Sequence, residues 1–200
     1  ARAAVEAAAE GYVDAVIAAP QTQTAIAKAG IAFDGYPTFV ASVLGMPRDD
    51  AFLMLCFEGK RVAHVTLHHS IRRALDLVTY DRVLMCIRAV DEALRQAGMA
   101  SSRIAVSGLN PHAGEDGLFG GEDAEIIVPA INSARQAGID VVGPYGADLL
   151  MHEKADAHIV MLHDQGHIPA KLLAKHNTAG HTIGTGIRFS SVAHGSALDI

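Results

Sequence analysis

Three of the eleven histidines in this 200-residue chain come just after apolar, β-rich runs. His68 follows RVAHVTL, His112 follows IAVSGLNP, and His163 follows DAHIVML. In open α/β sheets ligands collect beyond the carboxyl ends of strands, so three such ends can converge on one cleft although they are far apart in the sequence. Imidazole is the commonest metal ligand, and three of them with an open position would polarise a substrate hydroxyl or carbonyl. The pattern therefore favours a three-histidine metal site.

A different metal site is suggested by His163 and His167, which stand four residues apart in HDQGH and would share one helical face. This pair lacks the glutamate of the HExxH pattern, and Gly166 and Pro169 make a regular helix less favourable there. Five further histidines have no motif around them and are expected to be surface or core residues: His64, His152, His158, His176 and His181.

The glycine-rich segment NPHAGEDGLFGGED joins a predicted strand to a predicted helix. Glycines let the backbone approach a ligand, and a helix start presents free amides. The segment matches neither the P-loop nor the dinucleotide-binding pattern, and GTGIRFS near the C-terminus lacks the third glycine of the latter. A purely structural interpretation, a long turn with Glu122 and Asp123 at a helix N-terminus, remains equally open.

Three charged residues near the predicted strand ends are candidates for proton transfer. Lys171 lies eight residues after His163, about two helical turns away, and would hold an anionic group, move a proton, or simply be solvated. Asp148 and Asp164 would act as a base, as the partner of a ligand histidine, or as helix N-caps. The sequence does not choose among these roles.

The elements that would position these residues alternate along the chain. Predicted strands lie in the runs VDAVIAAP, AFLMLCF, RVAHVTL, IAVSGL, IDVVGP and DAHIVML. Predicted helices lie in TAIAKAG, DRVLMCIRAVDEALRQAG, GEDAEIIVPAINSARQAG, GADLLMHE and DQGHIPAKLLAK. This alternation predicts an α/β fold with a largely parallel or mixed sheet.

Composition narrows the function classes. With 50% apolar and 19% charged residues the chain can bury the core of one domain or of two small lobes. The net charge of −6 and scattered lysines argue against a nucleic-acid partner. Cys56 and Cys86 lie in apolar runs and are expected to be buried thiols, which indicates a reducing compartment. No apolar stretch is long enough for a membrane span. A cytoplasmic location is expected, and the chain is expected to be a fragment of a longer enzyme.

Four motifs in order resemble the 4-hydroxythreonine-4-phosphate dehydrogenase family: GLNPHAGEDG, GPYGAD, MLHDQGHIPAKLL and SSVAHGSALDI. The resemblance runs over essentially all 200 residues. It implies a fold similar to isocitrate and isopropylmalate dehydrogenases, with two α/β lobes around a cleft and about the first third of the enzyme absent. Residues 17–140 would form a central lobe with dimer contacts, and residues 1–16 and 141–200 would belong to the NAD-binding lobe.

The resemblance also implies roles for individual residues. The metal ligands of the family fall on His68, His112 and His163, in a cleft completed by a second subunit of a homodimer. Lys171 would contact the anionic end of the substrate, and Asp148 takes the place of the acid in GPxxAD. The family's HGSAxDI segment would place four residues against NAD: His194, Gly195, Asp199 and Ile200.

Departures from the family pattern concern the substrate. Biosynthetic members carry a His-Lys pair where this chain has Gln21, Thr22 and Gln23, and their FTGHTEF reads FDGYPTF here. Phe189 replaces an expected arginine, with Arg188 one place earlier. These changes resemble the branch that oxidises terephthalate cis-dihydrodiol, in which Lys171, Arg188 and Thr22 would meet a carboxylate substrate.

The activity that the resemblance implies is an NAD-dependent oxidation of a secondary alcohol with decarboxylation, assisted by a divalent metal (Zn, Fe, Co, Mn or Mg). The terephthalate dihydrodiol would yield protocatechuate. The alternative within the family is 4-hydroxythreonine-4-phosphate dehydrogenase or a related dehydrogenase of a 4-phosphate acid. The alternative from another class is a metal-dependent hydrolase or lyase, in which the same histidines activate water.

Overall fold

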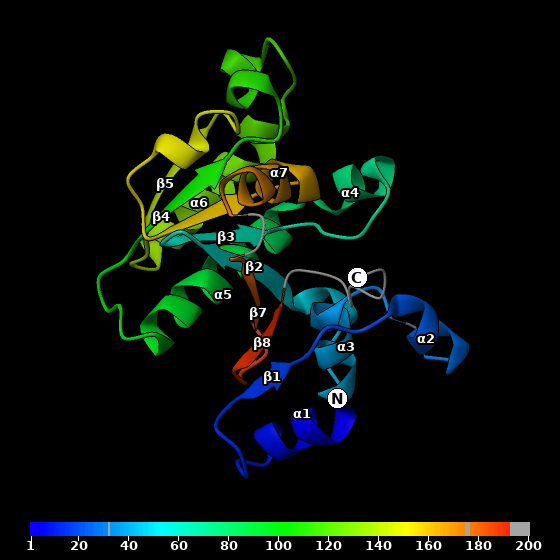
Figure 1. Cartoon of the computed structure of the whole chain (residues 1–200). Helices are drawn as coiled ribbons and strands as arrows, with labels where there is room; N and C mark the ends of the chain where they lie inside the picture. Colours follow the sequence, from blue (N-terminus) through cyan, green and yellow to red (C-terminus); the bar gives the residue numbers. More distant parts are fainter. Residues whose placement is uncertain (32, 175–176, 193–200) are drawn as a thin grey trace.

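The strands of the computed structural model form one sheet (Figure 1). The structure describes residues 1–31, 33–174 and 177–192, and within these the sheet has eight strands in the order β1-β8-β7-β2-β3-β6-β4-β5. The strands are β1 (Val16–Ala18), β2 (Phe52–Phe57), β3 (Lys60–His64), β4 (Arg103–Ser107), β5 (Asp140–Tyr145), β6 (Ala157–Val160), β7 (Ala179–Ile183) and β8 (Phe189–Val192).

The prediction of an α/β fold with a mixed sheet is confirmed. Strands β3, β6, β4 and β5 are parallel neighbours, whereas β2 runs antiparallel to both β3 and β7. Strands β7 and β8 form an antiparallel pair, and β1 lies parallel to β8 at the edge. The β7–β8 pair was not among the predicted strands.

Helices connect and cover the strands. The α-helices are α1 (Arg2–Ala9), α2 (Gln23–Lys28), α3 (Tyr36–Val43), α4 (Ile71–Leu77), α5 (Tyr80–Gln96), α6 (Val128–Gln136) and α7 (His163–Leu173). Short helical turns are η1 (Arg48–Asp50), η2 (Pro111–Gly117), η3 (Asp123–Ile127) and η4 (Leu150–His152). The helix predicted in GADLLMHE is therefore reduced to the single turn η4.

The helix predicted in GEDAEIIVPAINSARQAG is divided in two. Its first part, η3, is a π-helical turn, and the regular helix α6 follows. Pro129 stands in the first turn of α6 and has no N–H to donate to the preceding turn. The π-helical hydrogen bonding of η3 therefore ends at this proline, and α-helical hydrogen bonding continues in α6.

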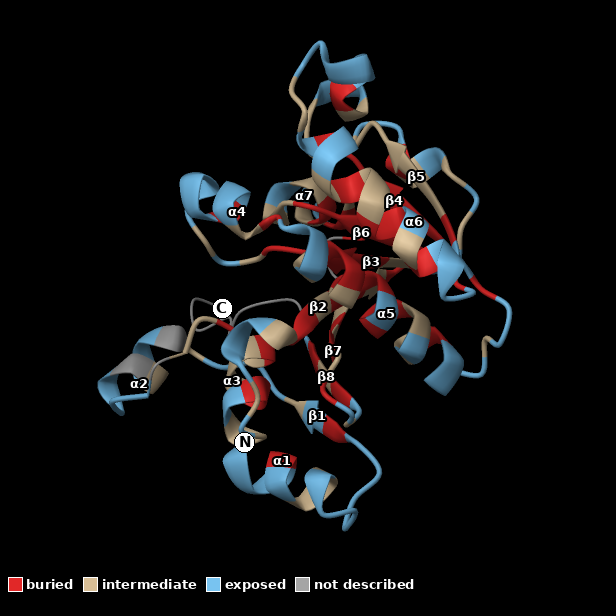
Figure 2. Cartoon of the chain, turned by 180° about the vertical axis from the view of Figure 1, so that it is seen from behind, coloured by how far each residue is buried: buried red, intermediate tan, exposed pale blue. Residues whose placement is uncertain are grey.

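The core lies on both faces of the sheet (Figure 2). On one face the buried residues of α5 and α6, such as Ile87 and Ile131, pack against Ile104 and Ile159 of the central strands. On the other face Ala170 of α7 packs with Leu55 and other strand residues. A third, smaller cluster joins α1, α3, β1 and β8 through Val5, Val40 and Phe189. Of the helices described, none is both long and apolar enough to cross a membrane.

The topology brings the three predicted ligand segments to one edge of the sheet. Strands β3, β6 and β4 are adjacent and parallel, so their carboxyl ends share that edge. His68 follows β3, His163 begins α7 directly after β6, and His112 lies in the turn η2 after β4. The strands of residues 17–140 and 141–200 share this sheet, and β1 crosses the boundary after residue 16. The sheet therefore gives no domain boundary, and the division into residues 17–140 and two flanking parts stays a prediction.

Candidate active site

His68 and His163 lie side by side at this sheet edge. Their ring centroids are 5.6 Å apart and their planes are inclined at 47°. A metal ion lies in the plane of each imidazole that binds it, with a metal–nitrogen distance of about 2.1 Å, so two rings on one tetrahedral ion have centroids about 5 Å apart. The spacing and inclination of this pair therefore suit two ligands of one ion.

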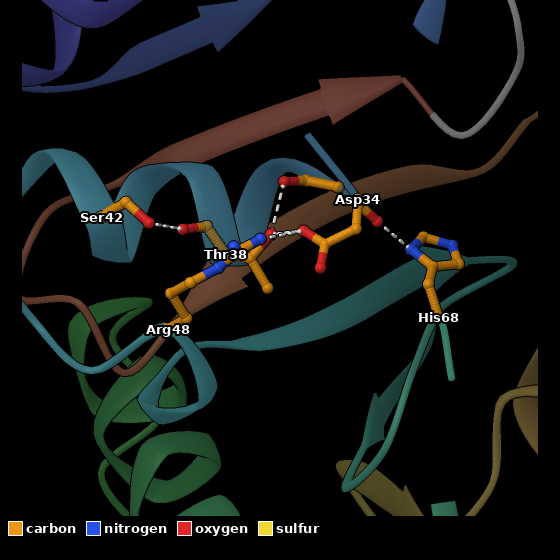
Figure 3. Close-up of polar contacts among 6 residues, drawn as sticks. Asp34, Thr38, Ser42, Arg48 and His68 are labelled. Carbon is orange, nitrogen blue, oxygen red and sulfur yellow. Dashed lines mark hydrogen bonds and ion pairs between the residues drawn. The ribbon is translucent and has the colours of Figure 1, made fainter. Parts of the chain in front are cut away.

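The loop before α3 holds the His68 ring (Figure 3). Nδ1 of His68 donates a hydrogen bond to the main-chain oxygen of Asp34. The Asp34 carboxylate in turn accepts hydrogen bonds from the Thr38 hydroxyl and from Arg48, the latter at 3.0 Å. Although burial opposes ionisation of Asp34, these two partners lower its pKa. The loop is thus fixed by a charged network behind the histidine.

The other two predicted ligands have the same arrangement around Nδ1. Nδ1 of His163 donates to the Asp164 carboxylate at 2.7 Å, and Nδ1 of His112 donates to the Glu115 carboxylate at 2.6 Å. The Glu115 hydrogen bond raises the pKa of His112. In all three rings the proton is therefore assigned to Nδ1, and Nε2 keeps its lone pair. Metal-binding histidines have this pattern, because an oxygen acceptor fixes their tautomer and orientation.

His112 stands in an unusual backbone segment. His112, Ala113, Glu115 and Asp116 all have positive φ angles between 41° and 54°. A left-handed conformation costs about 1–2 kcal/mol per non-glycine residue, so contacts elsewhere must hold the segment. The Asp123 carboxylate, 2% exposed, supplies them by accepting hydrogen bonds from the main-chain N–H groups of Leu109 and Asn110. Asp123 lies in the first turn of η3, as the structural interpretation of this segment expected, and its carboxylate in addition holds the preceding loop.

Asp148 lies near the His112 segment. Its charge contributes to the raised pKa of His112, and a Cβ on the neighbouring Gly146 would lie 3.8 Å from the His112 Cα. Asp164 is instead the hydrogen-bond partner of His163, one of the roles proposed for it from the sequence. The two acids therefore accompany different histidines.

The structure brings together two of the three predicted ligands. Across the described residues no group of three or more His, Cys, Asp or Glu side chains is placed to hold a metal ion. His112 makes its described ring contacts with Glu115 and Phe119 of its own segment. The donor chemistry fits a divalent metal, and the three-histidine site remains a prediction that needs His112 to join the pair.

His167 takes part in a different way from the predicted i, i+4 metal pair. Its ring is stacked on His163, with centroids 3.8 Å apart and planes only 9° from parallel. One ion cannot lie in two parallel planes at this separation, so the two rings cannot bind the same metal. On its other side, Nδ1 of His167 is 3.1 Å from Nε2 of His64.

His64 was expected to be an ordinary core or surface residue, and the structure places it beneath the site. It is 1% exposed on β3, and burial, with a contribution from His167, lowers the pKa of His64 to about 3. Burial and the neighbouring His163 lower the pKa of His167 to about 4. Both imidazoles are therefore neutral at physiological pH. The position of His64 between Ala63 and Val65, inside a predicted strand, was the available sequence signal for it.

The buried His64 predicts a pH dependence of stability. In the unfolded chain its pKa returns to about 6.5, so below this pH the unfolded state binds a proton that the folded state refuses until about pH 3. The free energy of unfolding should fall as the pH is lowered from 7 to 5, with a contribution of up to about 1.4 kcal/mol per pH unit from this group. Urea denaturation at both pH values should show a smaller decrease for His64→Leu, and equal decreases would contradict this assignment.

The remaining predicted residues are dispersed. Lys171 lies on the exposed side of α7, and its charge contributes to the lowered pKa of His167. Arg188 lines a cavity of about 460 Å³ between α5 and the strands β2, β7 and β8, whereas His68 lines a different pocket.

Thr22 precedes α2, where its carbonyl oxygen accepts hydrogen bonds from the N–H groups of Ala25 and Ile26. His194, Gly195, Asp199 and Ile200 lie outside the described residues.

Arg188 precedes β8 and lines the cavity beside α5, and its role in substrate binding stays a prediction. The sequence analysis missed two hydrogen-bond partners of the candidate ligands, the main-chain oxygen of Asp34 and the Glu115 carboxylate. Glu115 stands three residues after His112, and this spacing was the available signal for it.

Comparison with known proteins identifies the family of this chain. The family described as "Pyridoxal phosphate biosynthetic protein PdxA" matches residues 1–200. The chain is 48% identical over 201 residues to a Comamonas sp protein named 1,2-dihydroxy-3,5-cyclohexadiene-1,4-dicarboxylate dehydrogenase, covering 100% of this chain and 64% of the relative. It is 42% identical over 195 residues to 4-hydroxythreonine-4-phosphate dehydrogenase of Geobacter metallireducens, covering 96% of this chain and 57% of the relative.

A solved structure also matches the whole of this chain. The crystal structure of a terephthalate 1,2-cis-dihydrodiol dehydrogenase from Burkholderia xenovorans LB400 matches with a TM-score of 0.84 and 46% identity, covering 100% of this chain and 64% of that chain. This chain therefore spans somewhat less than two thirds of the length of these relatives. The family match over the whole sequence shows that the chain belongs to the PdxA family.

Proposed function

We propose that the protein is an NAD-dependent, metal-assisted dehydrogenase that oxidises terephthalate 1,2-cis-dihydrodiol, with loss of carbon dioxide, to protocatechuate. The single observation that carries the proposal is the common state of the three histidines. His68, His112 and His163 each donate Nδ1–H to an oxygen and keep Nε2 available. Support for the substrate comes from the Comamonas relative, whose name describes the same cyclic diol dicarboxylate.

The chemistry of the substrate sets the tasks of the site. The carbon bearing the secondary hydroxyl loses a hydride to a nicotinamide, and the hydroxyl loses its proton to a base. The resulting ketone is β to a carboxylate, which leaves as carbon dioxide. The electron pair of the broken carbon–carbon bond restores the aromatic ring as an enolate, and the proton held by the base returns to its oxygen to give the second hydroxyl of protocatechuate. A divalent metal, when bound, supplies positive charge next to the reacting oxygen.

The chain's own residues would divide these tasks. Asp164 and Glu115 hold the Nδ1 protons of His163 and His112, so that Nε2 of each faces a ligand as an unprotonated nitrogen. Asp148 is close enough to influence His112, and it would accept the hydroxyl proton, with Asp164 and Lys171 as the alternatives. Lys171, on α7 two turns after His163, would bind a substrate carboxylate.

We further propose that a second copy of the chain completes the site. His68 and His163 lie together, whereas His112 does not join them among the described residues of one chain. A homodimer in which His112 of one subunit approaches the pair of the other would supply three ligands. The NAD site at HGSALDI and the isocitrate dehydrogenase-like arrangement of two lobes also belong to this proposal, and the separate cluster around β1 and β8 supports the second lobe.

The experiment that tests the function is a comparison of substrates. NADH formation is followed at 340 nm, an absorbance that oxidised NAD lacks, with terephthalate dihydrodiol or 4-hydroxythreonine 4-phosphate, each with Zn²⁺, Mg²⁺, Mn²⁺ or Fe²⁺. We expect turnover of the dihydrodiol with release of carbon dioxide. Turnover of the phosphate substrate alone would assign the protein to the biosynthetic activity instead. Hydrolysis of a test ester without any NADH would favour a hydrolase.

A further inference from the structure

Two histidines outside the predicted ligand set lie directly behind His163. His64 comes from β3 and is 1% exposed, whereas His167 comes from the second turn of α7. The rings of His64 and His167 are 4.7 Å apart and inclined at 52°, and those of His167 and His163 are stacked. The three rings therefore form a continuous row from the core to the sheet edge.

The hydrogen bonds of this row are satisfied by a single arrangement of protons. Nδ1 of His64 is 3.3 Å from the Leu53 carbonyl oxygen, so it carries the proton and donates it there. Nε2 of His64 is then an acceptor, and it receives Nδ1–H of His167 at 3.1 Å. The same N–H also lies 3.2 Å from the carbonyl oxygen of His163. Both rings are neutral in this arrangement, and every described contact of their nitrogens pairs a donor with an acceptor.

The backbone is shaped to allow this contact. Gly166 is buried in the first turn of α7, and a Cβ there would overlap His64 Nε2 and lie 3.0 Å from Val62 Cγ1. A side chain at this position would lift the helix from the strand and separate His167 from His64. The absence of a side chain at residue 166 is therefore a condition for the histidine row.

We propose that His64 and His167 are positioning residues that fix the ring plane of His163, an inference that rests on the proposed metal-binding role of His163. The Asp164 hydrogen bond fixes one nitrogen of His163 but leaves its ring free to tilt about that bond. The parallel face of His167 removes this freedom, and the hydrogen bond to His64 prevents His167 from turning. An aliphatic residue at 167 would fill the space without defining a plane.

The test uses substitutions that separate packing from orientation. In His64→Leu/His167→Leu both hydrogen-bond partners become apolar together, so no buried polar atom of this pair is left unsatisfied and stability should change little. In His64→Leu/His167→Phe the hydrogen bond is also absent, but a flat ring remains to stack on His163. His152→Leu is the matched control, because His152 is exposed on η4 and outside the row.

Cobalt(II) serves as the probe in the full chain, since its affinity is measured by calorimetry and its visible spectrum reports ligand geometry. We expect the leucine pair to bind cobalt at least about tenfold more weakly than the wild type, with an altered spectrum. The phenylalanine variant should recover part of the affinity, and kcat should fall more than KM rises. His152→Leu should match the wild type.

The outcomes distinguish this inference from the function on which it rests. If the wild type binds cobalt and both double variants bind it equally well with the same spectrum, the positioning role is wrong and the proposed metal site stands. If the wild type binds no cobalt, zinc or manganese, the proposed metal-dependent function is wrong and the positioning role is wrong with it. Equal losses in the leucine and phenylalanine variants would also contradict orientation by stacking.

Discussion

Replacing His112 with alanine is expected to remove the bound divalent metal and to lower turnover of the dihydrodiol by about a thousandfold. The reason is that two imidazoles from His68 and His163 alone hold a divalent ion weakly. Metal content after dialysis and NADH formation would be measured together. His152→Ala is the control, because this exposed histidine lies outside the site.

The same variant tests whether the site is shared between subunits. If His112 comes from the partner, a dimer of one His112→Ala chain and one His163→Ala chain contains one intact site and one doubly defective site. Random mixing makes half of the dimers mixed, so co-expression should restore about a quarter of the wild-type activity in a twofold-symmetric dimer. No restoration would mean that one chain supplies all three ligands. Full activity and metal content in His112→Ala would refute the metal site itself.

Replacing Asp123 with alanine is expected to lower the free energy of unfolding by about 2–4 kcal/mol, because buried N–H donors lose a charged acceptor. Its carboxylate accepts the main-chain N–H groups of Leu109 and Asn110 at 2.8 and 3.1 Å, and the Asn110 side chain at 2.9 Å. These bonds hold the segment in which His112 adopts a left-handed conformation. Metal affinity should therefore decrease together with stability.

The adjacent Glu122 provides a matched control for this prediction. Glu122 accepts one hydrogen bond from the Asn110 side chain at 2.8 Å, but it is exposed and binds no main-chain N–H of the loop before His112. Glu122→Ala should leave the free energy of unfolding, as measured by urea denaturation, close to that of the wild type, because an exposed side-chain contact contributes little. If the two variants lose equal stability, the buried carboxylate does not hold the segment as described.

Much of the fold could be predicted from the sequence because its signals are local. The apolar runs AFLMLCF and RVAHVTL became β2 and β3, and DRVLMCIRAVDEALRQAG became α5 with Gly98 just beyond its end. The prediction was less accurate where backbone hydrogen bonding depends on context. GADLLMHE has a helical composition, yet only one turn forms between β5 and β6. The strands β7 and β8 gain most of their definition from pairing with each other and with β2.

For the candidate site too, some features could be predicted from the local sequence and others could not. The placement of His68, His112 and His163 after strands was readable, because strand ends follow from apolar runs. The pairing of His68 with His163 depended on the parallel register of β3 and β6, which no local pattern specifies. That Arg188 lines the cavity beside α5 also depended on the packing of β8, and its contact with a substrate carboxylate stays a prediction.

By itself, the sequence determined the α/β class, the membership in a dehydrogenase family, and the three histidines on which a metal site would depend. Only the tertiary structure decided which of them meet, that His167 stacks on His163 in a geometry in which the two rings cannot bind one ion, and that His64 lies beneath both. The physical reason is that residue type and spacing fix local conformation and donor chemistry. The plane of a ring and the partner of each nitrogen are set by strand register and by the close approach of α7 at Gly166.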